Sequence, residues 1–200
     1  QGKYDQALEY RKKAIDIGYT LNEPDWIAIC NNNIGNIYKA RGYYSIAIDY
    51  YLKALQTFEE MNQPRRVATC THSVGTLFFE QQNYQKAMEY YERALEIALQ
   101  TGDRIRELNL KMSIGNTLAV MGQSKLAKKN YFEALNIYDS TGYQHGLDDC
   151  CKLLGITLLE EQNTDSAVMY FEKALKFSLD ENDLSNMTEI YGKQGMVYLM

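Results

Sequence analysis

The chain has 200 residues, of which 46% are hydrophobic and 24% charged, and its formal net charge at pH 7 is −5. This acidic balance argues against a surface for nucleic acid or for an anionic membrane, because both need clustered basic side chains. The longest apolar runs, such as residues 153–159, are far too short to cross a bilayer. The first residues lack the apolar stretch of a signal peptide.

The first predicted element is a helix over residues 1–20, followed by a connector at 21–23. Its apolar stripe consists of Tyr4, Ala7, Leu8, Ala14 and Ile15. Pro24 then opens the next helix, where its missing N–H costs no hydrogen bond. That helix should end near Gly42, a residue that can adopt the left-handed conformation of a helix terminus. Its apolar stripe consists of Trp26, Ile27, Cys30, Ile34, Ile37 and Tyr38.

A partner helix is predicted from Tyr44 to Met61, joined to the preceding helix by a tight turn. Its inward residues should be Ile46, Ala47, Tyr50, Tyr51, Ala54, Leu55 and Phe58. One set of positions in this helix pair then recurs three more times, each time forty positions further along the chain. The set consists of Gly35, Tyr38, Ala47, Tyr51 and Ala54, then Gly75, Phe78, Ala87, Tyr91 and Ala94, then Gly115, Leu118, Ala127, Tyr131 and Ala134, and finally Gly155, Leu158, Ala167, Phe171 and Ala174. A fixed period of this size is typical of a solenoid.

The period divides the chain into a single array of helix pairs. Complete repeats are predicted at 24–63, 64–103, 104–143 and 144–182, flanked by partial repeats at 1–23 and 183–200. The remaining first helices should lie near 64–81, 104–121 and 144–161, and the second helices near 84–101, 124–140 and 164–180. A last helix should begin near Asp183. Because both ends fall inside repeats, we expect the chain to be a fragment of a larger protein.

The recurring small residues predict close packing between helices. Glycine in the middle of a helix costs about 1 kcal/mol relative to alanine, so four glycines at one register need a compensating contact. We expect the alanines at the position of Ala47 to face these glycines. The aromatic residue four positions later should fill the gap towards the next repeat.

Four cysteines raise the question of a disulfide or a metal site. Cys30, Cys70 and Cys150 occupy equivalent positions in three repeats, and Leu110 takes that position in another. Equivalent positions should lie about 8–10 Å apart, too far for a disulfide. We therefore expect buried free thiols, and we expect Cys150 and Cys151 not to form a zinc site.

The sequence pattern L/I-G-x-x-Y/F followed by A-x-x-x-Y/F-x-x-A resembles the tetratricopeptide repeat, over the whole chain. The resemblance implies an all-α solenoid, a right-handed superhelix of antiparallel helix pairs. The leading Trp and trailing Pro of the family are missing, and the period is longer than the family's usual value of about 34 residues. This long form looks like the arrays of bacterial signalling regulators and of animal polarity adaptors.

In such arrays the first helices line a concave groove, and the resemblance implies that this groove binds a peptide or protein segment. The candidate contacts are Asn32, Asn36, Lys39, His72, Thr76, Phe79, Met112, Asn116, Ala119, Lys152, Ile156 and Leu159. The asparagines are the most informative, because an amide can both donate to and accept from a peptide backbone. Alternatively, these asparagines face solvent or bond to the next helix.

Other chemistry has weak support in the sequence. His72 has no acid or thiol at ligand spacing on its own helix face, and His145 lies by a turn, so we expect structural or polar groove roles for both and no metal or cofactor. The arginines at 65, 66, 104 and 106 could hold an acidic peptide, or they could be solvated. The carboxylates show no association with a nucleophile or a phosphate loop. A stacking platform for single-stranded nucleic acid would also need a basic groove.

The leading interpretation is therefore a non-catalytic scaffold that binds a protein or peptide in its groove. We expect it to be the sensor or adaptor part of a larger cytoplasmic signalling protein. The alternative is a structural spacer or self-assembly element. Incomplete repeats at both ends predict end-to-end association of the fragment, because a solenoid needs polar capping units.

Overall fold

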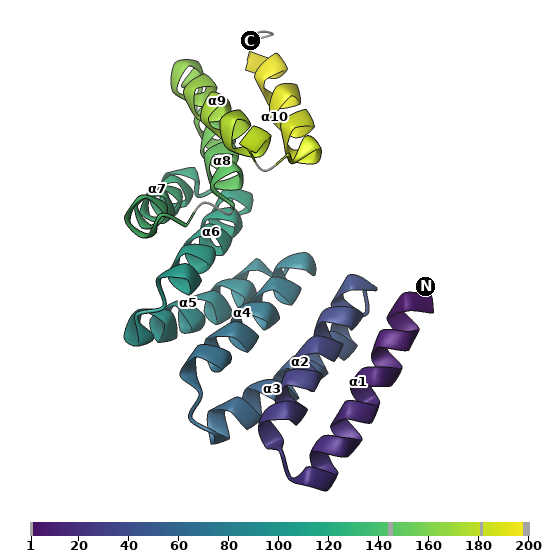
Figure 1. The fold of residues 1–200 in the computed structure, drawn as a ribbon. Coiled ribbons are helices and arrows are strands. Elements are labelled where there is room, and N and C mark those ends of the chain that lie inside the picture. Colours follow the sequence, from purple (N-terminus) through teal and green to yellow (C-terminus); the bar gives the residue numbers. More distant parts are fainter. Residues whose placement is uncertain (1, 144–145, 181, 198–200) are drawn as a thin grey trace. The chain divides into compact units, whose positions relative to one another are not determined.

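The computed structural model of the chain describes residues 2–143, 146–180 and 182–197 (Figure 1). Within these ranges the chain forms ten α-helices and no strand. The helices are α1 (Gly2–Leu21), α2 (Pro24–Ala40), α3 (Tyr44–Glu60), α4 (Pro64–Glu80), α5 (Tyr84–Thr101), α6 (Arg104–Val120), α7 (Ser124–Thr141), α8 (Leu147–Glu160), α9 (Thr164–Asp180) and α10 (Leu184–Val197). The predicted all-α solenoid of helix pairs is confirmed.

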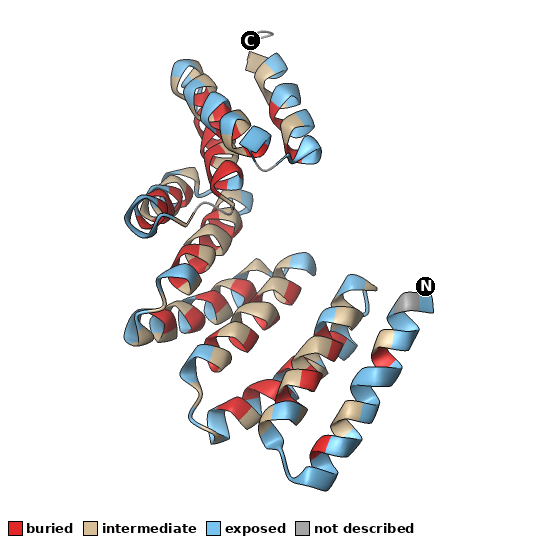
Figure 2. Cartoon of the chain, viewed as in Figure 1, coloured by how far each residue is buried: buried red, intermediate tan, exposed pale blue. Residues whose placement is uncertain are grey.

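Helix packing follows chain order. Helix α2 packs on α3, α4 on α5, and α8 on α9, and neighbouring pairs join through α3 on α4 and through α7 on α8. Figure 2 shows that the buried residues form stripes on the facing sides of these helices, while the other sides are exposed. The helices fall into two compact units, residues 1–106 (unit 1) and 107–200 (unit 2).

The turns repeat with half the period of the helix pairs. A residue with positive φ occurs at every twentieth position from Asn22 onward. These residues are Asn22, Gly42, Asn62, Gln82, Gly102, Gly122, Gly142, Gln162 and Asn182. Left-handed backbone ends a helix because it lets the last N–H groups bond back to its final carbonyls. The helix stop predicted at Gly42 is confirmed.

Helix α8 begins later than predicted, at Leu147. The start expected at residue 144 lies outside the described residues. Helices α2 and α4 begin with proline, and the Asp103 carboxylate accepts the Arg106 N–H at the start of α6. The residue before α8 is Gly146, at φ +81. A positive φ does not fit α-helical geometry, so α8 begins after this residue.

The mid-helix glycines have a different partner from the one we predicted. A Cβ added to Gly35 would lie 2.7 Å from the ring of Tyr51, and one added to Gly115 would lie 2.5 Å from the ring of Tyr131. Gly75 and Gly155 meet Tyr91 and Phe171 in the same way. The aromatic ring of the same repeat therefore occupies the space that a Cβ would fill, and the glycine penalty is offset by this contact.

The same rings also join neighbouring repeats, as predicted. Tyr51 is fully buried and packs with Ala47 and with Val74 and Leu77 of the next repeat. The recurring alanines are all fully buried, namely Ala47, Ala54, Ala87, Ala94, Ala127, Ala134, Ala167 and Ala174. The same ring thus packs within its own helix pair and against the following pair.

Three apolar residues that we predicted to be inward are exposed. Tyr4 is 44% exposed, Ile46 41% and Trp26 61%. Ile46 precedes the fully buried Ala47, and it is Ile48, following Ala47 on the other side of α3, that packs against this core. Each of the three lies at the margin of its helical stripe, where spacing alone does not decide burial.

The cysteines are free and buried, as predicted. Burial raises the pKa of Cys70 to about 12 and that of Cys151 to about 11, so these thiols are protonated and weakly nucleophilic at neutral pH. Among the described residues, no three of the His, Cys, Asp and Glu side chains come together as a metal site. No helix in these ranges has both the length and the apolar character needed to cross a membrane.

Candidate functional site

The first helices of unit 1, α2 and α4, carry six of the predicted contact residues. Asn36 is exposed, and the other five are half-buried, so each retains some access to solvent. These five are Asn32, Lys39, His72, Thr76 and Phe79. We call the surface of α2 and α4 formed by these six residues, together with Arg106 at the start of α6, the unit 1 face.

Asn36 is held by a tyrosine of the partner helix. The hydroxyl of Tyr51, on α3, donates to Asn36 Oδ1 at 2.7 Å. In unit 2 the hydroxyl of Tyr131, on α7, donates to Asn116 Oδ1 at 2.8 Å. The possibility that these asparagines bond to the next helix is therefore realised through their carbonyl oxygens. Their amide nitrogens have no hydrogen-bond partner among the described residues.

Asn32 has a different partner, in the neighbouring repeat. Its Oδ1 accepts a hydrogen bond from the Cys70 thiol at 3.4 Å. The contact joins α2 to α4, and it gives one of the repeat-equivalent cysteines a role beyond apolar filling. Asn32 therefore contributes to packing within unit 1, whether or not it also contacts a ligand.

His72 lies between aromatic and basic groups. Its ring meets the ring of Tyr91 edge to face, at 5.4 Å between centroids. Burial lowers the pKa of His72 to about 4, and the positive charges of Arg106 and Lys39 lower it further in the same direction. The imidazole is therefore neutral at pH 7, and it contributes no charge to the unit 1 face.

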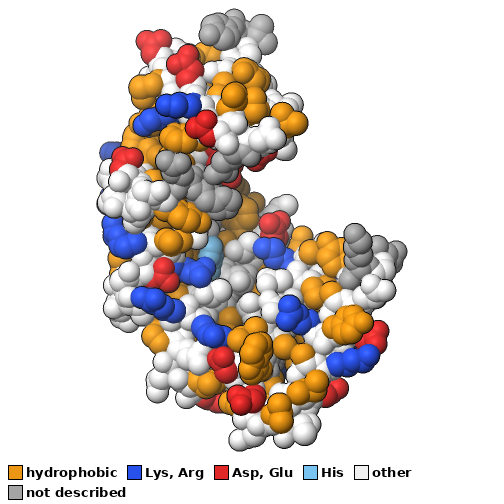
Figure 3. Space-filling model, viewed as in Figure 1, with side chains coloured by type: hydrophobic (Ala, Val, Ile, Leu, Met, Phe, Trp, Pro, Cys, Tyr) orange, Lys and Arg blue, Asp and Glu red, His pale blue; other side chains and the backbone are white. Residues whose placement is uncertain are grey.

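Lys39 and Arg106 provide the positive charge near His72. Figure 3 shows basic side chains close to the histidine. Arg106 Nη2 donates to Thr69 Oγ1 at 2.9 Å, but its buried Nε has no hydrogen-bond partner in the part of the chain that the structure describes. Lys39 forms no ion pair with any described residue. These groups place positive charge and an unpaired N–H on the unit 1 face.

Unit 2 holds a pocket that brings three of the predicted residues together. Its volume is about 430 Å³, and it is lined by Asn109, Met112, Asn116, Tyr138, Gly146, Asp149, Lys152 and Leu153. Met112, Asn116 and Lys152 were predicted as contacts. Asn109 was not, although it lies seven residues before Asn116 on the same face of α6 and spacing could have identified it. Asp149, in the first turn of α8, is a further lining residue that was not predicted.

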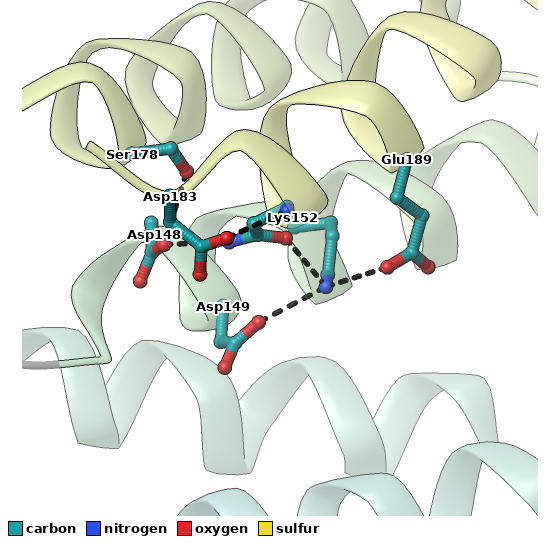
Figure 4. Close-up of polar contacts among 7 residues, drawn as sticks. Asp148, Asp149, Lys152, Ser178, Asp183 and Glu189 are labelled. Atoms are coloured by element: carbon teal, nitrogen blue, oxygen red, sulfur yellow. Dashed lines mark hydrogen bonds and ion pairs between the residues drawn. The ribbon is translucent and has the colours of Figure 1, made fainter. Parts of the chain in front are cut away.

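Lys152 is already engaged within the chain (Figure 4). Its Nζ donates to Asn186 Oδ1 at 2.7 Å and pairs with Glu189 at 2.9 Å and with Asp149 at 3.0 Å. Burial alone would lower the pKa of Lys152, but the hydrogen bonds to Glu189 and Asp149 outweigh it, so the pKa is raised. The ammonium is thus charged and neutralised by its own chain.

A buried carboxylate, that of Asp148, holds Asn186 of this cluster in place. Asp148 Oδ2 accepts hydrogen bonds from Ser178 Oγ at 3.0 Å and from Asn186 Nδ2, and Asp148 is only 4% exposed. The Asp183 carboxylate caps α10 by accepting the Asn186 N–H at 3.0 Å. Figure 4 shows how these side chains link α10 to α8 and α9.

The remaining predicted residues are apolar or lie outside the described ranges. Ile156 and Ala119 are half-buried, whereas Leu159 is buried and is not accessible to a ligand, contrary to our prediction. Phe79 stacks edge to face on Tyr84 at 5.5 Å. His145 lies outside the described residues.

Comparison with known proteins agrees with this geometry. The family model of the tetratricopeptide repeat matches residues 1–60 and 27–100, and a second model of the same description matches residues 149–181. A search of curated proteins found no match.

Solved structures with the same fold include BtubC from P. vanneervenii, at TM-score 0.84 and 17% identity over 98% of this chain and 83% of that one. Aspartyl phosphate phosphatase F from Bacillus subtilis has TM-score 0.89 and 16% identity over 98% of this chain and 52% of that one. A Rap protein complexed with competence and sporulation factor has TM-score 0.82 and 18% identity over 95% and 53%. The chain thus spans about half the length of the last two proteins. On its sequence repeats, its helix pairs and the match to the family model, the chain belongs to the tetratricopeptide repeat family.

Proposed function

We propose that the first-helix surfaces of this chain bind an extended segment of a protein or peptide, without catalysis. One observation carries the proposal. Three residues predicted as groove contacts keep an accessible amide or ammonium nitrogen, namely Asn36, Lys39 and Asn116. Such groups bind peptide backbones and carboxylates through hydrogen bonds. The Rap protein of similar fold, which was solved in complex with competence and sporulation factor, supports this class of function.

The two units offer different chemistry to such a segment. The unit 1 face presents Lys39 and Arg106, and it therefore favours acidic side chains. The unit 2 pocket presents Asn109, Asn116 and the exposed carboxylate of Asp149, and it favours polar groups without negative charge. Such selective binding suits the sensor or adaptor part of a cytoplasmic signalling protein.

The test is a selection of linear 12-residue peptides displayed on phage, with the 200-residue chain as the target. Calorimetry then measures each enriched peptide against Asn36→Ala combined with Asn116→Ala. We expect at least a tenfold loss of affinity, which corresponds to about 1.4 kcal/mol. The matched control is Asn130→Ala on the second helix α7, where the amide bonds to a backbone carbonyl of its own helix. Equal affinity for wild type and the double variant contradicts the proposal.

Self-association is the second candidate, and a separate surface favours it. Ile17 is 59% exposed, Leu21 65% and Trp26 61%, and together with Ala14, Gly18, Glu23 and Cys30 they line a mostly apolar pocket of about 320 Å³ between α1 and α2. Exposed apolar groups that gather in one place often mark an interface. Light scattering should show a mass that rises with concentration, and Leu21→Ser with Trp26→Ser should abolish the rise. A monomer at high concentration eliminates this candidate.

A further inference from the structure

The orientation of two asparagine amides follows from the tyrosines that hold them. An asparagine amide has a carbonyl oxygen that accepts and a nitrogen that donates. In Asn36 and Asn116 the oxygen already accepts a hydrogen bond from the hydroxyl of Tyr51 or Tyr131, which directs the oxygen towards the partner helix. The nitrogen is left as the group that meets solvent or a ligand.

We propose that Tyr51 and Tyr131 are positioning residues that fix Asn36 and Asn116 as hydrogen-bond donors, so that these sites recognise the carbonyl oxygens of a bound segment. This inference rests on the proposed function. It differs from the expectation drawn from sequence, in which each amide both donates to and accepts from a peptide backbone. Each asparagine acts within its own unit.

The tyrosines can hold the amides in this orientation because they are buried. Both rings are fully buried against a mid-helix glycine. A buried hydroxyl proton must find an acceptor, since an unsatisfied donor in the interior is costly. Turning the amide over, so that its nitrogen and oxygen exchange places, would remove that acceptor.

The hydroxyls also keep their protons. Burial raises the pKa of Tyr51 to about 12 and raises that of Tyr131 as well. Each hydroxyl is therefore a donor throughout the physiological range, and the asparagine oxygen stays in the accepting role.

In the other two repeats, the residues at the positions of Asn36 and Tyr51 vary together. Tyr91 donates to Thr76 Oγ1 at 3.5 Å, and Thr76 in turn donates to the His72 carbonyl at 3.1 Å, which leaves no proton for a ligand. In the fourth repeat the pair is Ile156 with Phe171, so the polar group and the hydroxyl are lost together. An asparagine amide donor at this position therefore occurs in the first and third of the four complete repeats.

The decisive variant is Asn116→Asp, with Asn36→Asp as its counterpart in unit 1. A carboxylate still accepts the tyrosine proton, so packing and melting temperature should stay as in the wild type. It has no N–H to offer, so affinity for a peptide enriched from the 12-residue library should fall at least tenfold, as it does for alanine. Measurements in 0.05 M and 0.5 M NaCl separate charge repulsion, which salt screens, from the lost donor.

A second variant tests the positioning role. Tyr131→Phe keeps a ring over Gly115, just as Phe171 covers Gly155. It should leave the melting temperature nearly unchanged and shift the NMR signals of the Asn116 side-chain amide. It should also let the amide turn and so weaken binding by about twofold to fivefold.

The outcomes separate the two proposals. If alanine at Asn36 and Asn116 does not weaken binding, the proposed function fails. If alanine weakens binding while aspartate at high salt retains it, the asparagines bind as acceptors, and the donor inference alone is overturned. An Asn116 amide signal that is unchanged in Tyr131→Phe overturns the positioning role of Tyr131.

Discussion

The two units use the same helix pairs, but they differ in how their cations are neutralised. On the unit 1 face, Lys39 has no ion pair among the described residues, and the nearby His72 is neutral. In unit 2 the lysine of the pocket, Lys152, pairs with Asp149 and Glu189. The charge of Lys39 is therefore available to pair with an acidic ligand, whereas that of Lys152 is already paired within the chain.

The largest expected effect tests what the two units share, the aromatic ring over a glycine. Gly115→Leu would place a side chain where Tyr131 lies 2.5 Å from the position of a Cβ. We expect the free energy of unfolding to fall by about 3 kcal/mol or more, measured by urea denaturation.

Gly192→Leu on α10 is the matched control for this change. A Cβ at that position meets nothing within 4 Å, so the variant should be as stable as the wild type or slightly more stable. Equal destabilisation by the two substitutions would contradict the ring contact.

The second prediction concerns the stability of the protein at acid pH, and it depends on His72, a residue of unit 1. Its folded-state pKa of about 4 lies below the ordinary value of 6.5, so the unfolded chain binds a proton first as the pH falls. The histidine should therefore lower the stability between about pH 6.5 and pH 4, by at most about 3 kcal/mol. Above pH 6.5 it should have no effect. The difference between wild type and His72→Gln, measured by denaturation at each pH, isolates this contribution, and parallel curves would refute it.

The third prediction concerns the polar anchor of unit 2. Asp148→Ala removes the acceptor of Ser178 and of Asn186, and buried donors without partners should cost about 1–3 kcal/mol. Hydrogen exchange should report faster opening of α10 than of α8. Uniform protection of α10 in the variant would show that apolar packing alone holds this helix.

The smallest effect tests the comparison of the two lysines directly. Lys39→Ala should weaken the binding of an acid-rich 12-residue peptide by about twofold to fivefold, consistent with a partly exposed ion pair of up to about 1 kcal/mol. The loss should shrink at 0.5 M NaCl. Lys152→Ala should show no such salt-dependent loss, because its charge is already neutralised. Equal losses would remove the distinction between the two units.

The sequence predicted the helices, the turns and the buried alanines because each repeats with a fixed period. The predictions of burial failed at residues whose exposure depends on a neighbouring helix. Trp26 and Ile46 lie at the edges of their stripes, and burial there depends on the neighbouring helix. The start of α8 differs because Gly146 adopts a left-handed conformation that ends the helical geometry there.

The candidate site was predicted in part. Spacing placed Asn36 and Asn116 on an accessible side of their helices, but their tyrosine partners lie fifteen residues away, on the following helix. Comparing the repeats could have revealed these pairs, since tyrosine becomes phenylalanine where asparagine becomes isoleucine. The partners of Lys152 on α10 are 34 and 37 residues away, and no pattern in the sequence indicates them.

The left-handed residues at every twentieth position also mark points between which a whole repeat can be added or removed. Because each helix ends in the same way, a cassette of one full period can be removed or duplicated between two such turns with the first and second helices of the pairs kept in alternation. A cassette of half a period would exchange the first and second helices. Loss or gain of a full cassette changes the number of amide donors by one at most. An array built in this way can gain or lose whole helix pairs in discrete steps, without redesign of its core.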